Sequence, residues 1–354
     1  GGIIRDPEAK PAAKILVDNP RKDIGKLTVA SHDGEVSVSS QKVKIDVDRQ
    51  TTLMKVTDLS TGKVVMEEKA PVDFKKNKYT VYLVEKPDEY FYGGGVQNGR
   101  FSHRGKKIDI VNTNSWTDGG VASPTPFYWS TGGYGIMCYT FAPGEYDFGA
   151  GTKNTVTLTH ESNYLDMFVM VDSTPVALLD DYYQLTGRPV LLPKFAFYEG
   201  HLNAYNRDYW KETTKDKGIL FEDGKYYNES QKDNGGIKES LNGEKNNYQF
   251  SARAVVDRYK AHDMPLGWVL PNDGYGAGYG QTETLDGNIA NLKSFGDYAR
   301  KNGVEIGLWT QSNLHPKEGI RALLQRDIVK EVRDAGVRVL KTDVAWVGDI
   351  IKYF

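Results

Sequence analysis

Short runs of alternating apolar and polar residues fill the first half of the chain. Alternation with a period of two places every second side chain on one face of a β-strand. Turn sequences such as HDG, STGK and FAPGE separate the runs, and this even spacing is typical of an antiparallel β-sandwich. We therefore predict an N-terminal β-sandwich domain over residues 1–187, closed by a short amphipathic helix at 173–187. The alternating runs are KLTVAS, EVSVSS, KVKIDVD, YTVYLVE, TVTLTH and YLDMFVMVD.

The pattern changes after Arg188-Pro189, where a linker begins. Apolar, strand-like runs now alternate with segments whose apolar residues recur with a helical period. This alternation is typical of an α/β domain, built either as a (β/α)8 TIM barrel or as a doubly wound sheet. No glycine-rich phosphate loop follows a strand, which disfavours a nucleotide-binding sheet. We predict a partial barrel over residues 188–354, comprising about the first four βα units. Its strands are expected at 193–200, 265–274, 304–313 and 337–343, and its helices at 251–263, 289–303 and about 321–335.

One segment does not fit this alternation. Residues 211–248 lie between the first predicted strand and its helix and are rich in glycine, asparagine and lysine. A loop of this length inside a compact domain is usually functional or disordered. It follows the C-terminal end of a strand, which is where a barrel carries its active site. We predict an insertion that caps the site, with a disordered spacer as the alternative.

Each predicted strand of the second domain ends in polar and aromatic residues. A barrel places its reactive groups at these C-terminal strand ends. A single polar strand end carries no information, but four in succession, with carboxylates and rings interleaved, indicate a pocket for a saccharide. The candidate residues are, strand by strand, Glu199, His201 and Asn203; Asn272, Asp273 and Tyr275; Trp309, Gln311 and Asn313; and Lys341, Asp343 and Trp346.

Lys341 and Asp343 lie two residues apart at the end of the fourth predicted strand, in the sequence VLKTDVAWVG. Residues two apart on a strand share a face, so both side chains should point the same way. The lysine favours the ionised form of the carboxyl group, and an ionised carboxylate in a sugar pocket can attack an anomeric carbon. The alternative is a Lys–Asp pair that only neutralises itself in a barrel core. Trp309 and Trp346 likewise serve either as platforms for a sugar or as packing.

Composition narrows the possible partners. A formal net charge of −2 with interspersed charges does not favour nucleic acid, and no apolar run is long enough to span a membrane. The 22 tyrosines and 6 tryptophans suit a protein that presents rings to a sugar, or one whose tyrosines edge a sandwich. The single cysteine, Cys138, excludes an internal disulfide, and no histidine or cysteine cluster has metal-ligand spacing. We expect neither a cofactor nor a metal.

Three segments resemble glycoside hydrolase family 31. FYGGGVQNGRFSHRGKKIDIVN, residues 91–112, is similar to the family's sandwich segment that closes over the sugar site. MPLGWVLPNDGYG is similar to its second barrel strand, and LKTDVAW occupies the place of its nucleophile motif. The resemblance implies a retaining exo-α-glycosidase in which Asp343 is the nucleophile and Asp273 binds the terminal sugar.

The resemblance also concerns the second catalytic group. In the family the acid/base is an aspartate on a loop after the sixth barrel strand, whereas this sequence ends at Phe354, just past the fourth predicted strand. We therefore expect that the acid/base is not in this chain, and that the chain by itself does not hydrolyse efficiently.

Departures from the common motif of the family bear on the sugar. KTD, residues 341–343, resembles the K-x-D of related α-galactosidases, and NDGY, residues 272–275, resembles their D-D-G-W, whose acids bind the 4- and 6-hydroxyls. The combination resembles the α-N-acetylgalactosaminidase branch of family 31. This implies a terminal α-linked N-acetylgalactosamine, or galactose, on a glycan or glycoprotein, and an extracellular or cell-surface location on a bacterium. The alternatives are an α-galactosidase, an α-glucosidase or a transglycosylase of the same family, or a non-catalytic carbohydrate-binding fragment.

Overall fold

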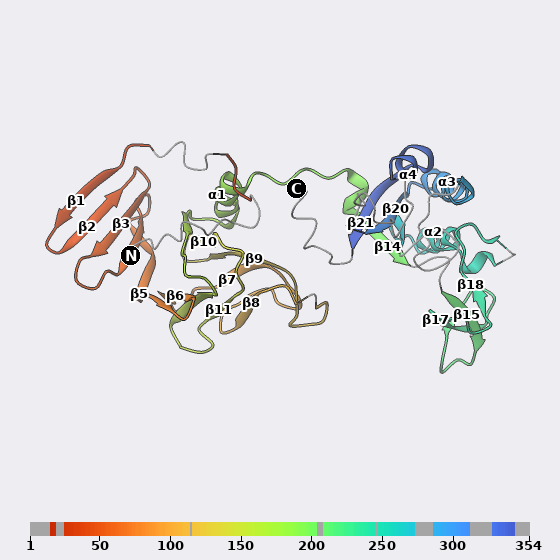
Figure 1. The fold of residues 1–354 in the computed structure, drawn as a ribbon, viewed down its shortest axis with the longest axis horizontal. Coiled ribbons are helices and arrows are strands. Elements are labelled where there is room, and N and C mark those ends of the chain that lie inside the picture. The colour runs from red at the N-terminus through yellow and green to blue at the C-terminus, as the bar shows by residue number, and fades with distance from the viewer. Residues whose placement is uncertain are drawn as a thin grey trace, which may run out of the picture. The chain divides into compact units, whose positions relative to one another are not determined.

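The computed structural model describes residues 15–18, 25–113, 115–203, 208–244, 247–272, 286–311 and 328–343. The chain divides into two compact units, residues 1–189 and residues 190–354. The sequence pattern places the change of architecture two residues earlier, after residue 187. Figure 1 draws the first unit from red through yellow-green and the second from green to blue.

The first unit is built from two antiparallel β-sheets. The alternation read from the sequence is visible in β6 (Lys78–Val84), where Tyr79, Val81 and Leu83 are buried and the residues between them are not. The larger sheet has nine strands in the order β1 (Thr28–His32), β2 (Glu35–Ser39), β3 (Val43–Asp48), β4 (Met54–Asp58), β5 (Lys63–Lys75), β6, β12 (Thr155–His160), β11 (Gly144–Phe148) and β8 (Lys107–Ile110).

The second sheet of this unit has four strands, in the order β13 (Met167–Val171), β10 (Tyr134–Cys138), β9 (Val121–Ser130) and β7 (Phe91–Gln97). One core joins the two sheets, because buried residues of both, such as Leu83 and Ile136, belong to the same apolar cluster. The predicted β-sandwich is thereby confirmed.

Helix α1 (Pro175–Thr186) closes this unit, as the sequence predicts. The hydroxyl of Thr174 accepts a hydrogen bond from the backbone N–H of Ala177, which caps the first turn. Leu178 is buried among side chains of the four-stranded sheet, and the ring of Tyr182 stacks on Phe127 with ring centroids 4.2 Å apart.

Three consecutive glycines let β7 run unusually close to β9. Gly93 has a φ of 115°, and a Cβ built on it would lie 2.7 Å from the carbonyl oxygen of Phe127. A Cβ on Gly95, with a φ of 78°, would lie 2.1 Å from the carbonyl oxygen of Ser123. A side chain at either position would therefore clash with backbone. The run GGG within residues 91–112 has this structural role in the sandwich.

The second unit contains a parallel four-stranded sheet in the order β14, β19, β20, β21. Helices alternate with its strands, as the sequence pattern predicts. The described strands form an open sheet, so the closed eight-stranded barrel stays a prediction. The strands are β14 (Glu199–Asn203), β19 (Leu266–Pro271), β20 (Glu305–Gln311) and β21 (Val337–Asp343), and the helices are α2 (Ala252–Ala261), α3 (Asp286–Lys301) and α4 (Ile328–Ala335).

The first strand of this sheet differs from the prediction for residues 193–200. Residues Lys194–Phe197 form the 3-10 helix η1, and the strand begins only at Glu199. A Cβ built on Gly267 of β19 would lie only 2.1 Å from the carbonyl oxygen of Phe195. This turn therefore packs closely on β19. A short apolar run has no period that distinguishes such a turn from a strand.

The two faces of the parallel sheet have different neighbours. Val269, Ile306 and Leu308 form one buried cluster with residues of α2 and α3, including Val256 and Phe295, so this face packs on helices. Trp268, Leu270 and Trp309 occupy the alternate positions and therefore lie on the opposite face.

The predicted insertion is a folded element. It forms a small antiparallel sheet in the order β16 (Ile219–Leu220), β17 (Tyr226–Ser230), β15 (Tyr209–Thr213), β18 (Ile237–Lys238), seen at the lower right of Figure 1. Trp210, Tyr227 and Phe250, the last from the 3-10 helix η3 (Tyr248–Phe250), form its buried aromatic cluster. The described residues 208–244 are therefore no unstructured spacer. That the insertion caps the site stays a prediction.

Candidate functional site

The predicted strand ends meet at one edge of the parallel sheet. Because all four strands run in the same direction, their C-terminal residues lie along the same edge. Gln311 is paired with Asp343, and Asn203 is paired with Pro271, the residue directly before Asn272. The four C-terminal strand ends therefore lie next to one another, and that they form a sugar pocket stays a prediction.

A lysine spans this edge on the face that is turned away from the helices. Lys341 Nζ donates a hydrogen bond to Asn272 Oδ1 at 3.0 Å, although β20 lies between the two strands. Adjacent strands are about 4.8 Å apart, so the two side chains and the hydrogen bond between them together span roughly 10 Å. Trp309 is paired with Lys341, and Trp268 with Glu305, four residues before Trp309. Continuing that register brings Asn272 level with Trp309, and we call these three residues the Asn272–Trp309–Lys341 row.

Trp309 is only 5% exposed, so the centre of the row is closely packed. Lys341 and Asn272 are half-buried. Half-burial strengthens a hydrogen bond from a charged donor relative to one in open water. Asp343 follows Lys341 by two positions on β21, and its register position lies on the same face, one step closer to the strand end.

Trp268 also lies on this face, although it is not among the candidate residues predicted from the sequence. It is paired with Gly200, and a Cβ built on Gly200 would lie 2.1 Å from Cζ2 of the indole. The ring therefore packs directly against the glycine backbone of β14. Trp268 precedes Asn272 by four residues and so shares its face. The alternation within PLGWVLPN contains this signal.

His201 and Glu199 do not join the row. His201 is paired with Val269, on the helix-facing side, and its Nδ1 lies 3.3 Å from the hydroxyl of Tyr259 on α2. Burial, and then the charge of Arg258, lower the pKa of His201. Glu199 is the first residue of β14 and is paired with Leu266, at the N-terminal edge of the sheet. Gly200 and Leu202 occupy the row's face of β14, and a substrate-binding role for Glu199 or His201 stays a prediction.

The remaining candidates are only partly described. Gln311 and Asp343 are placed by their register positions in β20 and β21. Asp273, Tyr275, Asn313 and Trp346 lie outside the described residues.

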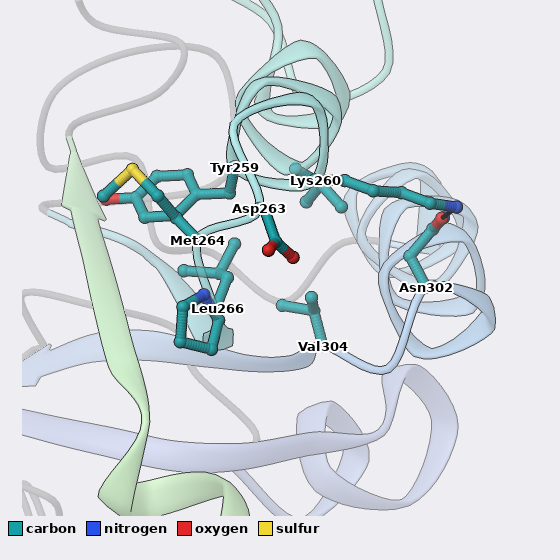
Figure 2. A pocket seen from close by; sticks show the side chains of 9 residues that line it. Tyr259, Lys260, Asp263, Met264, Leu266, Asn302 and Val304 are labelled. Carbon is teal, nitrogen blue, oxygen red and sulfur yellow. Dashed lines mark hydrogen bonds between the residues drawn. The ribbon is translucent and has the colours of Figure 1, made fainter.

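A hollow of about 420 Å³ lies at the opposite, N-terminal edge of the same sheet. It is formed by the turns that lead into β19 and β20. Figure 2 shows Lys260 and Asn302 meeting at one side of it, with Nζ and Oδ1 3.2 Å apart, and the carboxylate of Asp263 turned into the hollow. The N-terminal ends of such strands usually serve stability, so we assign no reaction to this hollow.

Neither a metal-binding cluster nor a membrane-spanning helix is found among the described residues. Within the described ranges, no group of three or more histidine, cysteine, aspartate or glutamate side chains could hold a metal ion. None of the helices that the structure describes is long and apolar enough to cross a membrane.

The chain is similar in sequence to known glycoside hydrolases. Residues 4–147 match the family model of the glycosyl hydrolase 31 N-terminal galactose mutarotase-like domain. The α-xylosidase XylQ of Lactiplantibacillus pentosus is 27% identical over 200 residues, which are 53% of this chain and 26% of that protein. These matches support glycoside hydrolase family 31. α-Glucosidase 2 of Bacillus thermoamyloliquefaciens is 25% identical over 178 residues, 48% of this chain and 22% of that protein.

Solved structures of family 31 share the fold. A dextranase mutant of Flavobacterium johnsoniae complexed with isomaltotriose superposes with a TM-score of 0.63 at 15% identity, covering 86% of this chain and 33% of that one. A soil-metagenome α-xylosidase complexed with xylose gives a TM-score of 0.58 at 16% identity, covering 86% and 42%. The chain thus spans about a quarter of the curated relatives' length. The names of these relatives concern xylose, glucose and dextran, and give no support to the α-N-acetylgalactosaminidase branch of family 31.

Proposed function

We propose that the protein containing this chain is a retaining exo-α-glycosidase of family 31 that removes a terminal α-linked sugar. The observation that carries this proposal is the Asn272–Trp309–Lys341 row, with the register position of Asp343 beside it at the C-terminal edge of a parallel sheet. Parallel sheets of this type carry their reactive groups at that edge.

In this proposal Asp343 attacks the anomeric carbon and forms a covalent glycosyl-enzyme. The positive charge of Lys341 favours the ionised, nucleophilic form of that carboxyl group. Lys341 also holds the amide oxygen of Asn272 at 3.0 Å, which leaves the amide N–H groups to donate to a sugar hydroxyl. The mechanism requires a second carboxylic acid, roughly 5–5.5 Å away, and we assign that role to no residue of this chain.

Two sugar configurations compete. The relatives are named for α-xylosidase and α-glucosidase activity, which favours an equatorial 4-hydroxyl or a pentose. The K-x-D spacing of Lys341 and Asp343 favours a galacto-configured sugar, N-acetylgalactosamine included, as the second candidate. A cation in the row would hydrogen-bond an axial 4-hydroxyl in that case.

The proposal is tested by offering the full-length gene product the p-nitrophenyl α-glycosides of xylose, glucose, galactose and N-acetylgalactosamine. Asp343→Asn should lower kcat by roughly a thousandfold or more on the sugar that is hydrolysed, because the nucleophile is lost. Asp334→Asn, at an exposed ion pair on α4, is the matched control and should leave the rate unchanged.

Each outcome decides one point. Full activity of Asp343→Asn would overturn the nucleophile assignment. Release from the N-acetylgalactosamine glycoside alone would establish the second candidate, and release from the xylose or glucose glycoside would exclude it. Binding of a sugar with no release from any of the four glycosides would leave a non-catalytic carbohydrate-binding protein.

A further inference from the structure

A hollow of about 440 Å³ lies between the insertion and helix α2. One wall is the insertion sheet, where Trp210 on β15 is paired with Glu229 on β17, so that both side chains stand on one face. Helix α2 contributes Arg258 to the opposite wall. In the described part of the chain, no residue of the Asn272–Trp309–Lys341 row lines this hollow, so it is a separate place in the second unit.

Aromatic contacts hold the walls of the hollow in place. The ring of Trp210 stacks on Phe250, with centroids 5.8 Å apart and planes inclined by 19°. Phe221 contacts both rings, at 5.0 Å and 4.7 Å. The guanidinium of Arg258 lies 5.2 Å from the centre of the Phe221 ring, and its Nη2 donates to Glu222 Oε2 at 3.0 Å. A ligand therefore meets walls that are already ordered, which lowers the entropic cost of binding.

The polar groups of the hollow suit a ligand with many hydroxyls. Glu229 and Glu239 present carboxylates, and the Trp210 indole N–H donates to Glu239 Oε1 at 2.9 Å. Gln249 and Arg258 also line the hollow, where Gln249 Nε2 donates to Asp223 Oδ2 and the Arg258 guanidinium is paired with Glu222. Two exposed apolar residues, Ile219 and Leu220, form part of the rim. Acceptors and donors around an aromatic wall match a sugar ring, which has apolar faces and a belt of hydroxyls.

The charges around the hollow disfavour other ligands. Three carboxylates, of Glu222, Glu229 and Glu239, face one guanidinium, so an anion would be repelled. The pKa of His201 is lowered by burial and by the charge of Arg258, so its ring is neutral at pH 7 and adds no positive charge. A purely apolar ligand would remove these polar groups from water without replacing their hydrogen bonds.

We propose that this hollow is a second carbohydrate site that binds a neutral sugar unit apart from the row. The choice of a sugar rests on the proposed function, whereas the hollow and its polar walls do not depend on it. Such a site lets the protein hold a longer glycan through a second of the glycan's sugar residues.

The test is isothermal titration calorimetry of the full-length gene product with the methyl α-glycosides of glucose, xylose and galactose. Glu229→Gln keeps the size of this exposed side chain and removes its charge. It should weaken one sugar-binding event by about tenfold or more, because hydrogen bonds to an ionised carboxylate are stronger than those to a neutral amide. Hydrolysis of the p-nitrophenyl glycosides should not change. Asp216→Asn, at an exposed turn of the same insertion, is the matched control and should change neither measurement.

Unchanged affinity and site number in Glu229→Gln would overturn the proposal. The proposal would also be overturned if the protein bound lysine methyl ester in a Glu229-dependent way and bound none of the three sugars. The hollow would then be a cation site. Sugar binding that depends on Glu229 in a protein that hydrolyses no glycoside would uphold this site while the proposed function fails.

Discussion

Lys341 connects two strands that are not neighbours in the sheet. Its Nζ reaches Asn272 on the far side of β20, and Trp309 occupies the position between them. The hydrogen bond thereby holds the ammonium group at the Asn272 end of the row. An amide oxygen accepts a hydrogen bond from an ammonium group without neutralising its charge.

Replacing this lysine tests whether its charge acts in the site. Lys341→Met in the full-length gene product should lower kcat/KM by roughly tenfold or more, since a charged hydrogen bond contributes about 1.5–3 kcal/mol. Asn272→Ala should cause a loss of similar size, and the double variant should lose less than the sum of the two. Lys301→Ala, at the exposed end of α3, is the matched control. A loss below about 1 kcal/mol, the range of an exposed ion pair, would contradict a role in the site.

At the scale of elements, the contact of β14 with β19 depends on a glycine. The indole of Trp268 occupies the space where the Cβ of any other residue at position 200 would lie. Trp268 and Asn272 share one strand face, so the position of this ring and the start of the row are coupled through β19.

Gly200→Ala should therefore destabilise the second unit by about 1–3 kcal/mol, the usual cost of overpacking. Urea unfolding followed by tryptophan fluorescence measures this loss. Gly287→Ala on α3 is the matched control, because nothing lies within 4 Å of the Cβ it would add. That change should be neutral or stabilising by up to about 1 kcal/mol, the difference in helix propensity between the two residues. Equal stability of the two variants would contradict the close contact with Trp268.

At the scale of the whole molecule, both units contain histidines whose pKa is lowered. Burial is the largest cause for His103 and His160 in the first unit and for His201 in the second. His160 is fully buried, its Nε2 lies 2.9 Å from the hydroxyl of Tyr146, and its Nδ1 lies 3.0 Å from the carbonyl oxygen of Ala142. A neutral ring satisfies both contacts, with Nδ1–H donating and Nε2 accepting.

The pH dependence of stability follows from these pKa shifts. Below the ordinary histidine pKa of about 6.5, the unfolded chain binds protons that the folded chain excludes. Stability is therefore complete above pH 6.5 and falls as the pH is lowered from there toward the depressed pKa values. Urea unfolding at pH 7.5 and pH 5.5 should show this loss, and His160→Gln should reduce it. A slope that His160→Gln leaves unchanged would contradict the assignment to this histidine.

Local sequence determined much of this protein. The two-residue period of the first half specifies the strands of the sandwich, because alternation is a property of neighbouring residues. The alternation of strands and helices in the second half, the helix at 175–186 and the polar strand ends follow from equally local signals. The resemblance of residues 91–112 to family 31 agrees with the match of the sandwich to that family.

Only the tertiary structure decided which side chains share a face and meet. Lys341 and Asn272 are 69 residues apart, and their hydrogen bond depends on the pairing of three strands. His201 lies on the helix-facing side of the sheet and Trp268 on the face of the row, and this placement depends on the register between β14 and β19. The sheet of the insertion likewise depends on aromatic contacts between Trp210 and Phe250. A periodic pattern specifies an element, but the register and the buried face are set by contacts with residues that are distant in sequence.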